Sequence, residues 1–256
     1  MSSTLLSVGP WLGVAVAVLA VVAAVVARVG RLGQERRIAV AAVRAVVQLG
    51  VVSLVITAIL GSLSLTAVFV LVMYTIAART AGRRATTHRS GWWAALPIVA
   101  GTAPVIGTLL ATGLLPAKAI AVIPVSGILI GGAMTATAQA ARRALDELHT
   151  RHGEWEAGLS LGMLPRDAGL EICRPSAAQA LIPALDQTRT VGLVTLPGAF
   201  VGMLIAGAHP LAAGATQLFV LVGLLAVETV AVVLTLELVV RGRIRPQLRA
   251  SSAASA

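Results

Sequence analysis

Four polar side chains interrupt long apolar stretches of this chain and are the first candidates for chemistry: Arg44, Gln48, Gln217 and Glu228. A charged or amide side chain within an apolar helix is costly to bury, so its presence favours a functional role. Glu228 lies near the middle of its stretch, where a carboxylate could relay protons or cations. A structural hydrogen bond would explain it equally well. Arg44 and Gln48 lie one helical turn apart and therefore share a helix face.

Two other apolar stretches carry glycines four residues apart, a spacing that lets two helix backbones approach closely. The pairs are Gly127 with Gly131 and Gly198 with Gly202. Each stretch also contains a proline, which frees a helical carbonyl that could line a pathway through a membrane. Close packing of helices alone accounts for the same pattern, so both interpretations stay open.

Several other chemistries lack their sequence signatures. The chain has no G-x-x-x-x-G-K-[ST] loop, so it is not expected to bind ATP in the P-loop manner. No histidine, cysteine or carboxylate cluster has metal-ligand spacing, and the single Cys173 excludes an intrachain disulfide framework. No Gly-x-Ser-x-Gly elbow occurs either. We therefore predict that the chain is not an enzyme and binds no cofactor itself.

The composition indicates a membrane protein. The chain is 57% hydrophobic and 12% charged, whereas a soluble domain is about 25% charged. Its net charge of +10 could suggest a nucleic-acid partner, but the basic residues recur in short clusters between apolar runs. That distribution is the positive-inside pattern of membrane proteins. We therefore predict a single polytopic membrane domain over residues 1–256, with the lipid bilayer and no nucleic acid as its partner.

The elements that must position the candidate residues are membrane-spanning helices. The apolar runs predict an all-α fold with seven spans, at about 11–27, 38–60, 65–78, 92–111, 119–141, 190–208 and 216–240. Of the twenty lysines and arginines, only Lys118 falls in a predicted outer segment. This bias places the N-terminus outside and the C-terminus inside. A helical stripe continues past Ala141, which predicts a cytoplasmic extension of the fifth span.

The longest polar interruption, residues 154–175, lies within the predicted cytoplasmic region 142–186. We expect a short helix over 154–161, a turn at Gly162, a second helix opened by Pro165, and Pro175 closing the unit. Its spacing resembles the EAA loop of ABC-transporter permeases, the helix-turn-helix that docks on the ATP-hydrolysing subunit. The residues that carry this resemblance are Glu156, Ala157, Gly158, Gly162, Ile172 and Pro175. An ordinary cytoplasmic loop with two glycines is the alternative.

Three further segments make the resemblance more specific. They are R-A-V-V-Q-L (44–49), I-P-V-S-G-I-L-I-G-G-A-M-T (123–135) and V-G-L-V-T-L-P-G-A-F-V-G-M-L-I-A-G-A-H-P (191–210). Together they resemble the Fet-type (FetB-like) family of iron-export ABC transporter permeases, whose plant relatives are implicated in aluminium tolerance. The resemblance covers roughly residues 35–240. It implies a homodimer in the cytoplasmic (inner) membrane, bound to two ATPase subunits that carry the ATP.

The sequence departs from the family pattern where methionine and polar side chains are expected. The departures are Ile128, Gly132, Ala199, Phe200, Val201 and Met203. Several soft or polar side chains that could bind a metal ion are therefore missing. These departures weaken the expectation of an iron cargo more than they weaken the expectation of a permease. The candidates for a translocation path are Gln48, Gly127, Gly131, Met134, Thr135, Pro197, Gly198, Gly202 and Glu228.

The leading hypothesis is the permease subunit of an ABC transporter that exports a metal ion such as iron. The first alternative is a stand-alone secondary transporter coupled to protons or cations through Glu228. The second is a membrane interaction protein that transports nothing. Substrate and direction follow only from the resemblance.

Overall fold

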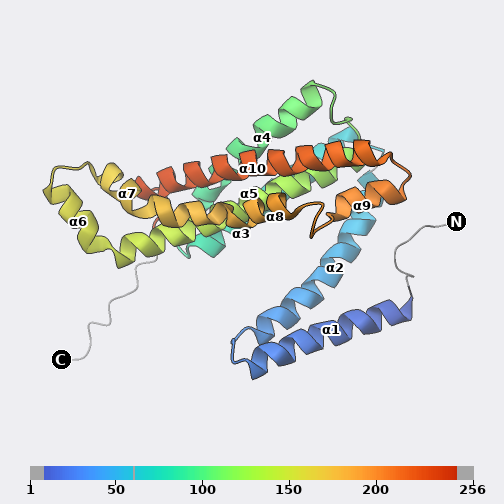
Figure 1. The fold of residues 1–256 in the computed structure, drawn as a ribbon, viewed down its shortest axis with the longest axis horizontal. Coiled ribbons are helices and arrows are strands. Elements are labelled where there is room, and N and C mark those ends of the chain that lie inside the picture. Colours follow the sequence, from blue (N-terminus) through green and yellow to red (C-terminus); the bar gives the residue numbers. More distant parts are fainter. Residues whose placement is uncertain (1–8, 60, 247–256) are drawn as a thin grey trace. The chain divides into compact units, whose positions relative to one another are not determined.

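The computed structural model describes residues 9–59 and 61–246, and its regular structure there is helical apart from one isolated bridge between Val191 and Thr195 (Figure 1). The helices are α1 (Pro10–Val29), α2 (Glu35–Ile59), α3 (Leu63–Ala85), η1 (Arg89–Ala94), α4 (Ala95–Ala111), α5 (Ala119–Thr150), α6 (His152–Ser160), α7 (Pro165–Ala178), η2 (Gln179–Leu181), α8 (Ile182–Thr190), α9 (Gly198–Ile205) and α10 (Pro210–Val240). The prediction of an all-α fold is confirmed.

Six of these elements are long and apolar enough to cross a membrane. They are α1, α2, α3, η1 with α4, α5 and α10, and they correspond to six of the seven predicted spans. α5 runs without interruption past Ala141 to Thr150, so the predicted helical extension of the fifth span is confirmed. The side of the membrane on which each end lies stays a prediction.

The chain divides into two compact units, residues 1–61 and residues 62–256, which are described separately. The first unit is a hairpin of α1 and α2, in which Pro10 opens α1 where no N–H is needed. Most of the valines and leucines of both helices are exposed, as expected of side chains that face lipid. Arg44 and Gln48 are exposed together on one face of α2. Gln48 is thus placed within the first unit only.

The core of the second unit forms around α5, which packs against α3, α10, α4 and α7. Alanines on the buried face of α5 have no exposed surface and let its neighbours approach closely, as at Ala140, Ala141 and Ala144. Leucines and valines of α7 and α10 complete this cluster. The backbone of α4 comes close to that of α10, because a methyl group on Gly101 would lie 2.8 Å from the carbonyl oxygen of Val227. The core therefore depends on small residues at helix crossings.

The segment 190–208, predicted as one span, is not a continuous helix. α8 ends at Thr190, and α9 begins only at Gly198. Between them Gly192 has a φ of +81°, and Pro197 lacks an N–H and disfavours helical backbone at the residue before it. The amides of Leu193, Val194 and Thr195 all donate to the carbonyl oxygen of Thr190 instead of continuing the helix. The expectation of a single helix here is therefore wrong.

The two short helices α8 and α9 nevertheless follow one another along α10 (Figure 1). α7 packs near the C-terminal end of α10, where Gly169 meets Val240, and α9 lies near its N-terminal end, where Phe200 and Gly214 line one cavity. Together α7, α8 and α9 thus follow α10 from its C-terminal end to its N-terminal end in separate pieces. This path is compatible with a discontinuous membrane crossing by residues 190–208, in addition to the six long helices. The total of seven spans stays a prediction.

Candidate functional site

α6 and α7 form a helical hairpin at the end of α5 (Figure 1). Gly162 has a φ of +87°, a left-handed conformation that glycine adopts at little cost. The amide of Met163 donates to the carbonyl of Gly158 (3.0 Å), which closes α6, and Pro165 occupies the first turn of α7. The predicted turn and second helix are present. Pro175, expected to close the unit, instead lies inside α7, which loses one internal hydrogen bond there and continues to Ala178.

Two contacts fix the two arms of the hairpin against each other, and a third fixes the entry from α5 into the first arm. A methyl group on Gly158 would lie 3.2 Å from the Cβ of Ala168, so this glycine allows α6 to meet α7 closely. The indole Nε1–H of Trp155 donates to the carbonyl of Pro165 (3.1 Å). Arg151 pairs with Glu154 where α5 passes into α6, and the hydrogen bond from this guanidinium lowers the pKa of Glu154. The hairpin therefore has a defined internal geometry.

The second arm is anchored to the membrane helices. Leu170, Ile172 and Cys173 are buried in the core cluster shared with α5 and α10. At the rim, Arg166 donates to both carboxylate oxygens of Glu237 (2.7 and 3.0 Å), and Glu237 also accepts from Arg241 (2.5 Å). The sequence indicated only the Glu237–Arg241 pair, because these residues lie four apart on one helix. α7 is thus packed directly against both α5 and α10.

The tip of the hairpin presents apolar side chains to solvent. Leu161 is 85% exposed and Leu164 is 66% exposed, and Met163 is also exposed. Glu156 and Ala157 lie on the exposed surface of α6, where the carboxylate of Glu156 is 3.4 Å from Nδ1 of His152. Exposed leucines gathered at a polar helix turn are typical of a surface that a protein partner or a membrane covers. Sequence reasoning missed these leucines, although they directly flank Gly162.

Cys173 is buried on the face of α7 that packs against α5. Its thiol donates to the carbonyl of Ala144 (3.4 Å). Burial, and secondarily the charge of Glu147, raises the pKa of the Cys173 thiol to about 11. A protonated, inaccessible thiol packs as a small apolar side chain. Within the described ranges no three histidine, cysteine or carboxylate side chains come close enough to hold a metal ion.

The glycine pairs on α5 and α9 occupy different surroundings. A methyl group on Gly127 would lie 3.2 Å from Cε of Met73 on α3, whereas one on Gly131 would meet nothing within 4 Å. Gly198 and Gly202 also face open space. Thr135 donates to the carbonyl of its own helix at Gly131 (3.0 Å), and Met134 packs against the core. Close packing within the chain therefore accounts for Gly127 alone among the four glycines.

Glu228 is buried on α10 and faces α5. A methyl group on Gly132 would lie only 2.6 Å from Oε1 of Glu228, so Gly132 makes room for this carboxylate. In the part of the chain that the structure describes, no arginine, lysine or histidine pairs with Glu228. Gly132 of α5 and Glu228 of α10 are therefore packed directly against each other.

A second buried polar side chain lies beside the break between α8 and α9. Gln217 is 6% exposed, and its Oε1 atom has no hydrogen-bond partner among the described residues. It lines a cavity of about 160 Å³ together with Gly192, Leu196 and Pro197. Neither Leu193 nor Leu196 has a carbonyl that accepts a hydrogen bond from a described group. The structure thus brings Pro197 to Gln217, which the sequence indicated only as an isolated polar residue.

The candidate path residues do not converge on one point of this chain. Gln217 and Glu228 are eleven positions apart on α10, which separates them by about 16 Å along the helix. Pro197 and Phe200, next to Gly198 and Gly202 in sequence, line the cavity of Gln217, and Gly127 to Thr135 lie on α5.

Comparison with known proteins identifies relatives. The model of an uncharacterised protein family, UPF0014, matches residues 11–244. The rice (Oryza sativa subsp. japonica) protein "UPF0014 membrane protein STAR2" is 37% identical over 76% of this chain and 70% of its own length. "Protein ALUMINUM SENSITIVE 3" of Arabidopsis thaliana is 37% identical over 59% of this chain and 56% of its own length.

A bacterial relative has a more specific name. "Probable iron export permease protein FetB" of Escherichia coli (strain K12) is 30% identical over 77% of this chain and 78% of its own length. These matches confirm the resemblance to the Fet-type family. The chain is a multi-pass membrane protein. No solved structure matches it.

Proposed function

We propose, from the premise that this chain belongs to the uncharacterised protein family UPF0014, that it is the membrane-spanning permease subunit of an ABC transporter. On this proposal a separate ATPase chain in the cytoplasm binds and hydrolyses ATP. Two permease copies form a homodimer in the cytoplasmic membrane, and the transporter exports a metal ion. The relative named as an iron export permease motivates this cargo.

The observation that carries the proposal is the α6–α7 hairpin. It has an exposed apolar tip at Leu161 and Leu164, a glycine-determined turn, and a second arm anchored by Ile172 and Arg166 to α5 and α10. A coupling element needs both properties, because it must bind a partner and pass the partner's movement to the membrane helices. An ordinary loop needs neither.

The break between α8 and α9 supports both a homodimer and a path. Carbonyl groups without hydrogen-bond partners are costly in lipid, so non-helical backbone at membrane depth must contact protein or water. Leu193 and Val194 of the break are exposed in this chain. A second copy or an aqueous path would cover them. Broken helices supply ion sites in other transporters through their freed carbonyls.

The test is to purify the chain from native membranes in gentle detergent with a non-hydrolysable ATP analogue and to identify its partners by mass spectrometry. We expect a stoichiometric P-loop ATPase. Glu156→Lys and Gly162→Trp should each abolish its co-purification while membrane insertion is retained. Gly33→Trp is the matched control, because Gly33 lies outside the hairpin, has a positive φ (+63°) as Gly162 does, and a side chain there meets nothing within 4 Å. Full retention of the ATPase by both hairpin variants would refute the coupling role.

A second candidate function follows from Glu228. A buried carboxylate without a basic partner among the described residues favours protonation or cation binding, as in a proton- or cation-coupled secondary transporter. Transport into proteoliposomes discriminates the two. ATP-independent uptake that is driven by a pH gradient and lost in Glu228→Gln would favour the second candidate. Transport that requires the ATPase would favour the first.

A further inference from the structure

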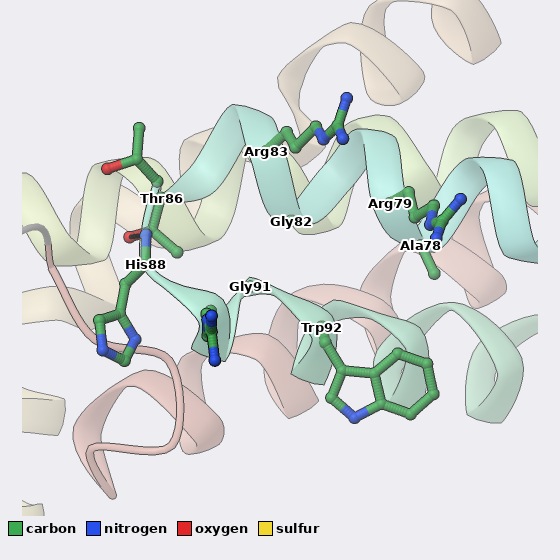
Figure 2. Close-up of a pocket in the computed structure, with 10 residues that line it drawn as sticks. Ala78, Arg79, Gly82, Arg83, Thr86, His88, Gly91 and Trp92 are labelled. Atoms are coloured by element: carbon green, nitrogen blue, oxygen red, sulfur yellow. Dashed lines mark hydrogen bonds between the residues drawn. The ribbon is translucent and has the colours of Figure 1, made fainter.

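A basic hollow lies between the end of α3 and η1, and it takes no part in the proposed coupling or path. It has a volume of about 680 Å³, within the range of small-molecule sites (Figure 2). Arg79 and Arg83 of α3 and Arg89 and Trp92 of η1 are among its lining residues, and Figure 2 labels Arg79, Arg83 and Trp92. We refer to these four residues and the space between them as the basic pocket.

The shape of the basic pocket is set by two glycines. The backbones of α3 and η1 touch at Gly82 and Gly91, because a methyl group on Gly91 would lie 2.9 Å from the carbonyl oxygen of Gly82. Nδ1 of His88 accepts a hydrogen bond from the amide of Ser90 (3.0 Å) and so caps η1. Thr86 donates to the carbonyl of Arg245 (2.8 Å). The connection from α3 to η1 is therefore fixed at both ends, and the walls of the hollow have a defined position relative to each other.

The charge of the basic pocket is uncompensated. Arg79, Arg83 and Arg89 are exposed, and across residues 9–59 and 61–246 none of them pairs with a carboxylate. No aspartate or glutamate lines the pocket. Three arginines that line one hollow favour an anionic ligand, because a planar guanidinium fork suits phosphate oxygens.

The position of the pocket selects the kind of phosphate. It lies where two membrane helices reach their arginine-rich ends, which the positive-inside rule assigns to the headgroup level of the cytoplasmic leaflet. Trp92 is 73% exposed, as expected of an indole at that interface. Trp93 beside it holds the guanidinium of Arg243 5.4 Å from its ring centre. A ligand that reaches this pocket from the bilayer would bring its phosphate to the arginines.

Apolar stripes lead from both walls of the pocket into the membrane. On α3, Ile76 lies one turn and Val72 two turns before Arg79 on the same helix face, and both are exposed. On α4, Leu96 and Val99 continue the face of Trp92 and are exposed as well. A phospholipid has this same combination, with a phosphate at one end and two acyl chains below it.

We propose that the basic pocket binds the headgroup of an anionic glycerophospholipid, with the acyl chains along Val72–Ile76 and Leu96–Val99. Basic pockets on the cytoplasmic side of membrane helices recognise such headgroups. An anionic lipid is preferred to a zwitterionic one because the pocket supplies three positive charges and no negative charge. The proposal does not depend on the ATPase or on the cargo.

The experiment compares the delipidated full-length chain with two variants of equal charge change. Arg79→Gln/Arg83→Gln alters the pocket, and Arg31→Gln/Arg36→Gln alters exposed arginines of the first unit. Each protein receives phosphatidylglycerol, phosphatidylcholine or inorganic phosphate. Native mass spectrometry measures bound lipid, and thermal melting measures stabilisation. We expect phosphatidylglycerol alone to bind and stabilise the wild type and the control, and binding to the pocket variant to be at least about tenfold weaker.

A photo-crosslinkable phosphatidylglycerol gives a readout that needs no variant. Its acyl label should attach to peptides that contain Val72–Ile76 or Leu96–Val99 in the wild-type chain. Equal lipid binding by pocket and control variants, or a label found only elsewhere, would overturn the proposal. Stabilisation by inorganic phosphate as strong as by the lipid would assign the site to a free anion instead. No lipid binding, with loss of a protein partner in the pocket variant, would assign it to a protein and also overturn the proposal.

Discussion

Truncation of the hairpin tip should weaken binding of the ATPase partner by a calculable amount. Burying a whole leucine side chain contributes about 1.5–3 kcal/mol, and truncation to alanine removes about 1–2 kcal/mol of this when the site is fully covered. Leu161 and Leu164 are 85% and 66% exposed, so nearly all of this contribution is available for docking. Each single Leu→Ala variant should therefore bind about 5- to 30-fold more weakly, and the double variant about 30- to 700-fold more weakly.

The assay is titration of the purified ATPase against detergent-solubilised permease, read by a surface-immobilised binding measurement. Leu32→Ala is the matched control, because Leu32 is 64% exposed in the connection between α1 and α2 and lies outside the hairpin. Folding should be unaffected, since neither tip leucine is buried in the chain. The reasoning is refuted if the double variant and the control bind equally well.

Three further predictions concern the membrane helices and the buried thiol. Gly101→Ala should destabilise the protein by about 1–3 kcal/mol, because the added methyl group meets the carbonyl of Val227. The control Gly107→Ala, on the same helix, adds a methyl group that meets nothing and should stabilise the protein by about 0.5–1 kcal/mol. Equal shifts in melting temperature for the two variants would contradict this prediction. Gln217→Leu should raise the free energy of unfolding, measured by denaturant titration, by about 1–3 kcal/mol, because it removes a buried amide whose Oε1 atom has no described hydrogen-bond partner. A loss of stability would contradict this, because it would mean that the amide forms a hydrogen bond in the protein. A pKa of about 11 keeps the Cys173 thiol protonated at pH 8. Iodoacetamide should therefore label this thiol in the native protein at least about 100-fold more slowly than a free cysteine, and should label it readily in denaturant. Fast labelling of the native protein below pH 9 would contradict the burial of the thiol.

Local signals in the sequence predicted most of the helices and the hairpin turn. Gly162 and Pro165 act within their own turn and first helical residue, so their effect does not depend on distant parts of the chain. The stripe past Ala141 likewise predicted the extension of α5, because helical periodicity is local. These features could be read without knowing any tertiary contact.

The break between α8 and α9 was missed because hydropathy does not distinguish a continuous helix from an interrupted one. Gly192 and Pro197 were visible, but either residue is tolerated in a membrane helix when neighbours satisfy the freed groups. The pairing of Glu228 with Gly132 was missed for a different reason. It depends on the register between α5 and α10, which tertiary packing fixes and no single helix reveals.

The length of α5 has a mechanical consequence. Its 32 residues form a rod of about 48 Å that carries the hairpin at one end and Ala119 at the other. If such a rod turns by about 10° around its middle, each end moves by about 4 Å in opposite directions. A push on the hairpin would then shift the far end of α5 at the same instant and by a similar distance, as a lever does. The two ends would share one motion, so a single bound partner could open one mouth of the protein while it closes the other.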